Sequence, residues 1–376
     1  MNDRKHKIYI CASSLGIGGV EKALLGLVNS FDYNKVDVDL QLANYGGEYM
    51  TYLNPNINLL PAQDFFSWVL LPKKGIFKSI CNLLNKPSVL YLFIKNIIWG
   101  VVHKNMAKSR QRMWLDVINY IPRQQSQYDE AFDFSGLFRR YVLQCITAKK
   151  KYTWIHSDYN VFGYDRTIDY ELLRQFDKVY CVSDTCKVIF DNVFPTLSNI
   201  SEVRLNIVDM RLIHSQLKGK SFEDNYNGVR LLDVTRIDPN KGLDIAVKVC
   251  SKLKQQGVHF RWYILGNDPL GYRKELEKLI LQYDVADCFI LLGFTSNPYP
   301  YMNDADIIVH FSRFEGRSVS IDEALALHKP ILLTDYPTAK DQITNGVNGW
   351  ICEFDDNELC EKLVQMINQK NLHEKS

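Results

Sequence analysis

The second half of the chain repeats one short pattern, and this pattern strongly limits the folds that the chain can adopt. Apolar runs of four to seven residues follow one another there, as VRLLDVT, FRWYILG, CFILLG, DIIVHFS and KPILLTD. Helical stretches such as GLDIAVKVCSKLKQQ and GYRKELEKLILQY separate most of them. Apolar runs of this kind are typical of parallel strands in a sheet that helices cover on both faces. The pattern therefore predicts an α/β domain with a doubly wound parallel sheet.

The first half opens in the same style. The apolar run KIYICASS leads through a glycine turn to ALLGLVNSF at helical spacing, and VDVDLQLAN then alternates with period two. With 376 residues the chain is long enough for two such cores. We predict two Rossmann-like domains, over 1–208 and 209–356, with the polar stretch 214–227 as the linker. A last amphipathic helix within 357–376 closes the chain, and whether it packs back on the N-terminal domain is left open.

Composition narrows the class of protein. The chain is 46% hydrophobic and 23% charged, which is typical of a globular protein rather than a disordered one. Its first residues are polar and charged and do not form a secretory signal. Its nine cysteines include no CxxC pair, which predicts reduced, mostly buried thiols in a cytoplasmic protein and argues against a zinc site.

Positive charge is concentrated in the first half. Residues 1–208 carry 25 Lys or Arg and 19 Asp or Glu, whereas residues 209–376 carry 20 and 24. The stretch 65–114, called the basic aromatic insertion below, accounts for this excess, because it holds nine basic residues and no acidic one. The basic residues are Lys73, Lys74, Lys78, Lys86, Lys95, Lys104, Lys108, Arg110 and Arg112, and the aromatic ones among them include Trp68, Phe77, Tyr91, Phe93, Trp99 and Trp114.

The basic aromatic insertion permits two interpretations. Its apolar run 89–102 has 14 residues and contains Lys95, whereas a membrane-spanning helix needs roughly 20 apolar residues. The insertion is then either a helical element packed on the first domain with a solvated lysine face, or a surface that binds an anionic membrane through its cations and apolar side chains. No nucleic-acid-binding motif accompanies it.

The strongest motif is FSRFEGRSVSIDEALALHKPILLTD, which follows the end of a predicted strand. Seven residues separate Glu315 from Glu323, among them Gly316, Ser318, Val319 and Ser320. A loop that enters a helix offers free backbone N–H groups and the positive end of the helix dipole to a phosphate or a sugar hydroxyl. Carboxylates placed there can accept hydrogen bonds from sugar and ribose hydroxyls. The motif suggests a nucleotide-sugar site, although a strand–loop–helix unit with a capping serine would show the same pattern.

A second motif, VTRIDPNKGLDIAV, places Arg236 at the end of a predicted strand and Lys241 just before a helix. Two cations at the carboxyl end of a parallel strand could offset the charge that develops on a leaving diphosphate. A surface Arg and Lys near a turn is the simpler alternative.

A third motif is the glycine loop SSLGIGGVEKALL after the first predicted strand. Gly16 and Gly18 fit the dinucleotide fingerprint, but Glu21 occupies the place of its third glycine, which counts against a dinucleotide. The loop, with Gly19, would still let the backbone approach a phosphate closely.

Together these segments resemble a glycosyltransferase of the GT-B fold, family 4, in their order and spacing over nearly the whole chain. GGVEK resembles the family's loop near the donor phosphates and acceptor. WIHSD resembles the segment that places a histidine beside the donor sugar, and LNIVD resembles the entry to the second domain. LGNDP resembles the donor-side loop near the base, and TDYPTAKDQITNGVNGW also fits. GFTSNPYPYMNDADIIVHFSRFEG is close to the form seen in bacterial enzymes of surface-polysaccharide assembly (capsule, O-antigen or exopolysaccharide).

The resemblance implies roles for particular residues. Glu315, His156, Arg236 and Lys241 would be catalytic, with Glu315 positioning the sugar and stabilising its oxocarbenium-like charge rather than acting as a nucleophile or general base. Glu21 would lie on the acceptor side. The donor would contact Gly18, Gly19, Arg236, Lys241, Gly266, Asn267, Glu315, Gly316, Ser318, Val319, Ser320 and Glu323.

The resemblance also implies the reaction. Two domains facing each other across a cleft would transfer a sugar from a nucleoside-diphosphate sugar with retention of its anomeric configuration. No metal cofactor would be needed, because protein cations and helix ends would hold the phosphates. The acceptor would be an undecaprenyl-diphosphate-linked oligosaccharide at the inner face of the cell membrane. Thr235 in place of a glycine, and EGRSVS in place of EGxP or EGxG, depart from the family pattern and leave the donor sugar open.

Three other functions remain as alternatives. The chain could be a soluble glycosyltransferase that modifies a protein or small molecule. A nicotinamide-dependent dehydrogenase is disfavoured by Glu21 and by the paired glutamates. A catalytically inactive scaffold is disfavoured because Glu315, Glu323, Arg236 and Lys241 are all present.

Overall fold

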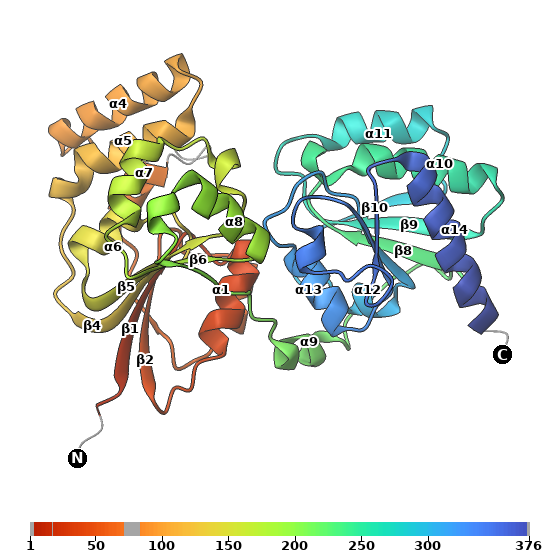
Figure 1. Cartoon of the computed structure of the whole chain (residues 1–376), viewed down its shortest axis with the longest axis horizontal. Helices are drawn as coiled ribbons and strands as arrows, with labels where there is room; N and C mark the ends of the chain where they lie inside the picture. The colour runs from red at the N-terminus through yellow and green to blue at the C-terminus, as the bar shows by residue number, and fades with distance from the viewer. Residues whose placement is uncertain (1–3, 17, 71–82, 374–376) are drawn as a thin grey trace. The chain divides into compact units, whose positions relative to one another are not determined.

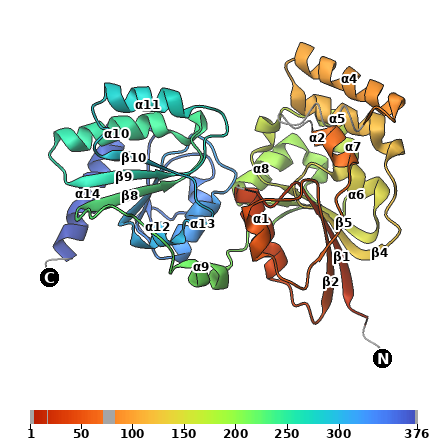
Figure 2. The same ribbon diagram turned by 180° about the vertical axis from the view of Figure 1, so that it is seen from behind.

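Two parallel sheets organise the chain, one in each half (Figures 1 and 2). The computed structural model describes residues 4–16, 18–70 and 83–373. The chain divides into two compact units between Ile207 and Val208. Both α/β cores that the sequence predicts are therefore present.

The first unit contains a seven-stranded sheet in the order β3-β2-β1-β4-β5-β6-β7. Its strands are β1 (His6–Ala12), β2 (Val36–Leu42), β3 (Asn58–Leu59), β4 (Gln127–Asp133), β5 (Thr147–Ile155), β6 (Lys178–Cys181) and β7 (Ser201–Val203). Its described α-helices are α1 (Gly19–Asn29), α2 (Phe65–Leu70), α4 (Pro87–Val102), α5 (Met106–Val117), α6 (Arg139–Cys145), α7 (Arg166–Leu173) and α8 (Asp184–Val193). Short 3-10 helices are η1 (Glu48–Tyr52), η2 (Ile118–Tyr120), η3 (Tyr159–Phe162) and η4 (Pro195–Leu197).

The second unit contains a six-stranded sheet in the order β10-β9-β8-β11-β12-β13. Its strands are β8 (Val229–Val234), β9 (Phe260–Leu265), β10 (Phe289–Gly293), β11 (Ile307–His310), β12 (Ile331–Thr334) and β13 (Trp350–Cys352). Its helices are α9 (Met210–Gln216), η5 (Pro239–Lys241), α10 (Leu243–Gln255), α11 (Arg273–Gln282), α12 (Tyr299–Asp304), α13 (Val319–Ala326), η6 (Ala339–Asp341) and α14 (Asp356–His373). The repeated apolar runs of the sequence are β8 to β12, as predicted.

Helices cover both faces of the second sheet, which explains why its strands are apolar throughout. In β9, Trp262 packs with residues of α10, α11 and α14, whereas its neighbour Tyr263 packs with residues of α12 and α13 on the other face. Both side chains are buried. The strand order is that of the Rossmann fold, with the reversal between β8 and β11, and ligands of such sheets bind beside the carboxyl ends of the strands at this reversal.

One boundary differs from the sequence expectation, and the packing of the last helix is now defined. The predicted linker, 214–227, begins inside α9, because Asp209 caps this helix by accepting hydrogen bonds from the backbone N–H groups of Arg211 and Leu212. The C-terminal helix is α14, which packs on α10, and its Leu363 and Ile367 belong to the core of the second unit.

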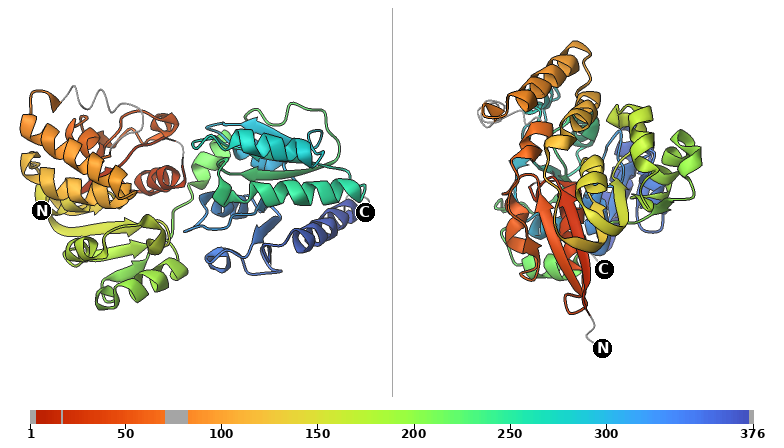
Figure 3. Two further views of the ribbon diagram at one scale, coloured as in Figure 1. Left: turned by 90° about the horizontal axis from the view of Figure 1, so that it is seen from above. Right: turned by 90° about the vertical axis from the view of Figure 1, so that its left-hand side faces the viewer.

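The basic aromatic insertion contributes α2, α4 and α5, and α4 lies on the outer side of α5 (Figures 1 and 3). Phe93 and Trp114 are buried in the core of the first unit. These two aromatic side chains point into the core, because the packing of the helices turns them inward, and whether the insertion binds a membrane stays a prediction. Lys73, Lys74 and Lys78 lie outside the described residues. Among the described helices, none combines the length and the hydropathy needed to cross a membrane.

The cysteines follow the composition-based expectation where the structure describes them. Eight have free, buried thiols, and the ninth, Cys81, lies outside the described residues.

Candidate functional site

The strand reversal of the second sheet carries a pair of buried ionisable side chains. Asp233 lies near the carboxyl end of β8, and His310 is the last residue of β11, which pairs with β8. His310 Nδ1 lies 3.1 Å from Asp233 Oδ1, and both side chains are only 2% exposed. The pair therefore bridges the place where sheets of this type bind ligands.

Glu315 joins this pair to Lys241. Its Oε1 lies 2.7 Å from His310 Nε2 and also accepts a hydrogen bond from Lys241 Nζ. Burial acts to raise the pKa of Glu315, but Lys241 and His310 outweigh it and lower this pKa to about 2. Burial acts to lower the pKa of His310, but Asp233 and Glu315 raise it to about 9. The Glu315 carboxylate is thus held ionised between two cations at neutral pH.

A glycine lets the loop after β8 approach the loop after β11. Gly242 follows η5 with a φ of +62°, and a Cβ there would lie 1.9 Å from the Phe311 carbonyl oxygen. Ser312 Oγ donates a hydrogen bond of 3.1 Å to the Asn240 carbonyl oxygen. This close contact places Lys241 against Glu315.

Arg236 and Lys241, the two cations expected to hold phosphates, have different surroundings. The Arg236 side chain is 53% exposed, and its nearest acidic oxygen is Asp238 Oδ2 at 3.7 Å. The Lys241 side chain is 12% exposed and paired with Glu315. The structure therefore pairs Lys241 with one of the predicted glutamates and leaves Arg236 facing solvent.

The loop after β9 contains Gly266 and Asn267 and touches the loop after β8. A Cβ on Gly266 would lie 1.7 Å from the Thr235 carbonyl oxygen, so a larger residue would force the loops apart. The backbone N–H of Ile237 donates a hydrogen bond of 2.8 Å to the Asn267 carbonyl oxygen. Asn267 Oδ1 and Thr235 Oγ1 are buried and have no hydrogen-bond partner among the described residues. These loops therefore hold two polar atoms whose hydrogen-bonding capacity is unused.

The predicted residues after Glu315 lead into α13. Gly316 and Ser318 lie in the loop, and Val319 and Ser320 are the first residues of the helix. The Ser318 backbone N–H donates to Gln342 Oε1 at 3.0 Å, and its hydroxyl lies 3.1 Å from the Ser320 hydroxyl. Ser318 is the N-cap residue of α13, but its side chain forms no cap hydrogen bond.

Glu323 lies in α13 and is 3% exposed. The Tyr299 hydroxyl donates a hydrogen bond of 2.8 Å to Glu323 Oε1. The two predicted glutamates thus differ, because Glu315 faces cations whereas Glu323 accepts from a neutral hydroxyl.

The predicted residues of the first unit follow β1 and β5. Gly18 and Gly19 lie at the start of α1, and the Glu21 side chain folds back toward Gly18 and toward the Ser14 hydroxyl, 3.4 Å from Glu21 Oε1. His156 Nε2 donates to a backbone carbonyl oxygen, that of residue 134, at 2.6 Å, and burial lowers the pKa of His156 to about 4. His156 is therefore neutral near pH 7 and already hydrogen-bonded within its own unit.

Sequence reasoning missed His310, Asp233 and Tyr299. The missed signal was present in the strands themselves, because LLDV and IIVH each carry an ionisable side chain at the end of an otherwise apolar run. An ionisable side chain in a buried strand costs free energy of desolvation unless a partner compensates for it, so such a residue indicates a buried partner.

Comparison with known proteins identifies the second unit. Residues 220–376 match the family model described as glycosyl transferases group 1. The amylovoran biosynthesis glycosyltransferase AmsK of Erwinia amylovora is 27% identical over 174 residues, which are 44% of this chain and 42% of that protein. The chain thus spans less than half of the length of this and similar curated relatives.

One relative is matched over nearly its whole length. The N-acetylgalactosamine-N,N'-diacetylbacillosaminyl-diphospho-undecaprenol 4-alpha-N-acetylgalactosaminyltransferase of Campylobacter jejuni is 27% identical, over 97% of this chain and 91% of that protein.

Solved structures share the fold. Anabaena HepE in complex with UDP-glucose has a TM-score of 0.67 at 15% identity, over 97% of this chain and 90% of that one. Staphylococcus aureus TarM has a TM-score of 0.65 at 13% identity, over 99% and 94%. The predicted GT-B fold is confirmed, and residues 220–376 are similar to the glycosyl transferases of group 1.

Proposed function

We propose that the chain is a retaining glycosyltransferase that transfers a sugar from a nucleoside-diphosphate sugar to a lipid-linked glycan during surface-polysaccharide biosynthesis. The observation that carries this proposal is the hydrogen-bonded network of Asp233, His310, Glu315 and Lys241 at the strand reversal. A carboxylate that two cations keep ionised can stabilise positive charge on a sugar ring without taking up a proton.

The surrounding residues suit the departure of a diphosphate. In the reaction, the bond between the anomeric carbon and the diphosphate oxygen breaks, and its electron pair leaves with the diphosphate. The acceptor oxygen bonds to the same face of the sugar, and its hydroxyl proton passes to the leaving diphosphate. Arg236 is exposed and can meet the leaving phosphates, with Lys241 beside Glu315 as the second cation. Fixed protein cations then stabilise the charge that a metal ion would otherwise offset, so we propose a metal-independent reaction.

The relatives indicate which substrates to test first. The HepE structure holds UDP-glucose, and the name of the Campylobacter jejuni relative specifies an undecaprenyl diphosphate acceptor. We therefore propose a uridine-diphosphate sugar as donor and an undecaprenyl-diphosphate-linked oligosaccharide as acceptor. Membership of family 4 remains a prediction.

A donor panel tests the transferase proposal. The purified chain is incubated with a set of nucleotide sugars, with and without a chelator, and the released nucleoside diphosphate is followed. We expect slow hydrolysis of one donor, unchanged by the chelator and lost in Glu315→Ala, while Glu277→Ala, an exposed glutamate on α11, serves as the matched control. No release from any donor, or a strict need for a divalent metal, would contradict the proposal.

We also propose that the first unit binds the inner surface of the cell membrane through α4. Exposed apolar side chains recur along this helix at spacings of three and four residues, which places them on one side. They are Tyr91, Ile94, Ile98, Val101 and Val102, each between 42% and 68% exposed. The basic aromatic insertion has no acidic residue, and each Lys or Arg near an anionic surface contributes about 1 kcal/mol.

Vesicle sedimentation tests the membrane proposal. We expect salt-sensitive binding to anionic vesicles and weak binding to neutral ones, and a loss of binding in the double variant Ile98→Gln, Val102→Gln. Val188→Gln on α8 is the matched control, because Val188 is similarly exposed at 59%. Changing Lys73, Lys74 and Lys78 to Glu is also predicted to release the chain. Equal binding to both kinds of vesicle, or none, would favour a soluble acceptor and a purely structural insertion.

A further inference from the structure

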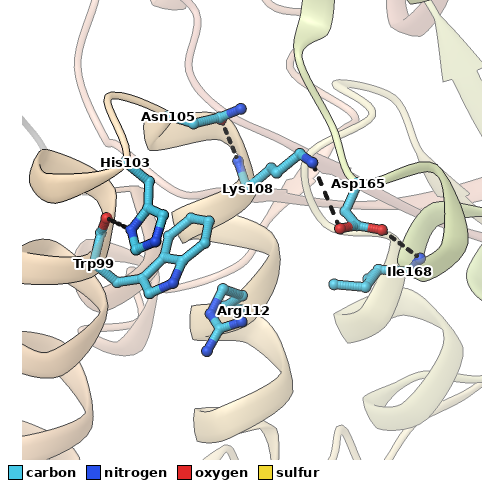
Figure 4. A pocket seen from close by; sticks show the side chains of 7 residues that line it. All are labelled: Trp99, His103, Asn105, Lys108, Arg112, Asp165 and Ile168. Atoms are coloured by element: carbon cyan, nitrogen blue, oxygen red, sulfur yellow. Dashed lines mark hydrogen bonds and ion pairs between the residues drawn. The ribbon is translucent and has the colours of Figure 1, made fainter.

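The first unit contains a cavity of about 310 Å³ between the end of α4, α5 and the start of α7 (Figure 4). Its volume lies at the lower end of the range for small-molecule sites. The residues that determine its chemistry are Trp99, His103, Asn105, Lys108, Arg112 and Asp165.

Arg112 is the cation of this cavity that lacks a counter-charge. Its guanidinium carbon lies 4.7 Å from the centre of the Trp99 ring. Its Nε is buried and has no hydrogen-bond partner among the described residues, and no ion pair with Arg112 occurs there. A guanidinium whose Nε is removed from water and has no partner favours an anion that accepts its hydrogen bonds.

Lys108 is only partly neutralised. Its Nζ lies 3.7 Å from Asp165 Oδ2, at the long end of an ion pair. Asp165 also caps α7, because its Oδ1 accepts hydrogen bonds from the backbone N–H groups of Thr167 and Ile168. Two cations and one carboxylate line the cavity, so it keeps a net positive charge.

The cavity is held in shape before any ligand binds. The His103 ring stacks on the Trp99 ring at 4.2 Å and an angle of 15°, and His103 Nδ1 lies 2.9 Å from the Trp99 carbonyl oxygen. Asn105 Oδ1 accepts from the Lys108 backbone N–H at 2.9 Å, which fixes the turn between α4 and α5. Figure 4 shows the His103 ring and the Arg112 guanidinium lying against the same indole.

The neighbouring surface indicates where the anion comes from. Ile98, Val101 and Val102 flank Trp99 and His103 in sequence and are 57%, 65% and 68% exposed. A ligand with a phosphate in the cavity and hydrocarbon beside these side chains would satisfy both features. A lipid phosphate has this combination, whereas a free phosphate ion or a sugar does not.

We propose that this cavity binds the doubly charged phosphate group of a membrane lipid, a phosphomonoester or a diphosphate, through Arg112 and Lys108. The planar guanidinium matches two phosphate oxygens at once, and Lys108 adds a second charge. A phosphodiester headgroup offers a single negative charge and fewer free oxygens, so it binds less tightly. This inference rests on the proposed membrane association and adds the lipid class to it.

The test compares vesicles of equal surface charge. Phosphatidylcholine vesicles contain either phosphatidic acid, a phosphomonoester, or phosphatidylglycerol, a phosphodiester, in amounts that match their zeta potentials. We expect the wild-type chain to bind phosphatidic acid vesicles about tenfold more tightly. Arg112→Gln and Lys108→Gln should each remove most of this preference and keep the binding to phosphatidylglycerol vesicles, and Arg112→Lys should restore part of it.

Arg204→Gln is the matched control, because Arg204 also lies over an aromatic ring, at 5.5 Å from that of Tyr180, but does not line the cavity. It should keep the full preference. Thermal melting checks that each variant folds. If Arg112→Gln does not fold, Lys108→Gln alone decides the test.

The outcomes separate this inference from the functions on which it rests. Equal wild-type binding to both anionic vesicles, or a preference unchanged in both variants, overturns the phosphate site and leaves the membrane proposal standing. Binding to neither vesicle overturns both. Donor hydrolysis, measured in the same preparations, reports on the transferase proposal alone.

Discussion

Each sheet carries a buried ionic network near its strand reversal, and the two networks differ in how fully their polar atoms are used. In the first unit, Arg139 Nη1 donates to both oxygens of Asp169, at 2.9 and 3.0 Å, and the Tyr159 hydroxyl donates to Asp169 Oδ2 at 2.6 Å. The Thr153 hydroxyl donates to Oδ2 of Asp133, the last residue of β4, at 3.0 Å. These contacts close the network on itself.

The network of the second unit stays open at one end. Glu315 lies in a loop, Arg236 faces solvent, and Thr235 Oγ1 and Asn267 Oδ1 are buried without a partner among the described residues. Burial raises the pKa of Asp133 to about 6, whereas Lys241 and His310 bring that of Glu315 down to about 2 despite burial. We infer that buried charge indicates a ligand site more strongly where unused hydrogen-bonding atoms lie beside it.

The largest expected effect is a loss of stability when the closed network of the first unit is broken. Arg139→Ala leaves Asp169 and Asp133 buried without their cation and should lower the free energy of unfolding of the first unit by about 3–5 kcal/mol. Chemical denaturation measures this loss. The control is Arg174→Ala, which removes an exposed pair with Glu171, each side chain 54% exposed, and should cost less than about 1 kcal/mol. Equal losses in the two variants would mean that the first network contributes no special stability.

Substitutions in the open network of the second unit should lower the rate of sugar transfer. Arg236→Ala or Lys241→Ala should slow sugar transfer by roughly 10²–10³, because each removes a preorganised cation from a developing anion. Initial rates with saturating donor measure this effect. Wild-type rates in both variants would show that the open end of the network does not receive the diphosphate.

The two glutamates should separate binding from turnover. Glu323→Ala should weaken donor binding by about 1.5–3 kcal/mol, since the ribose hydroxyls lose a charged acceptor. Glu315→Ala should act mainly on turnover. Calorimetry with the donor and single-turnover kinetics distinguish the two effects, and an unchanged affinity and rate in both variants would refute the assignment of this loop.

The smallest effect concerns pH. The folded-state pKa of His310 is raised to about 9, above its ordinary value of 6.5. Its contribution to stability is therefore complete below pH 6.5 and is lost as the pH rises through 9. Relative to His310→Gln, the wild-type second unit should lose on the order of 2 kcal/mol of unfolding free energy between pH 6.5 and 9. Parallel stability curves for the two proteins would show that His310 is not a cation in this network.

Much of the fold could be predicted because the relevant signals are local. The strands β8, β9, β11 and β12 are buried on both faces, so their apolar runs identify them directly. The predicted linker begins within α9, because the polar end of this helix has the composition of a loop. In the basic aromatic insertion, the sequence does not show that Phe93 points inward while Ile98 points outward, because this depends on how α4 packs against α5.

By itself, the sequence determined two parallel α/β units and the positions of Glu315, Glu323, Arg236 and Lys241 at the ends of predicted strands and starts of helices. Strand period, turn residues and helix starts depend on neighbours in the chain, so they can be predicted without the fold. Only the tertiary structure decided that Lys241, 74 positions away, pairs with Glu315, and that His310 joins Asp233 to the same carboxylate. These contacts join different strands and the loops that follow them, and the pKa values of His310 and Glu315 shift only when the sheet has formed and excluded water.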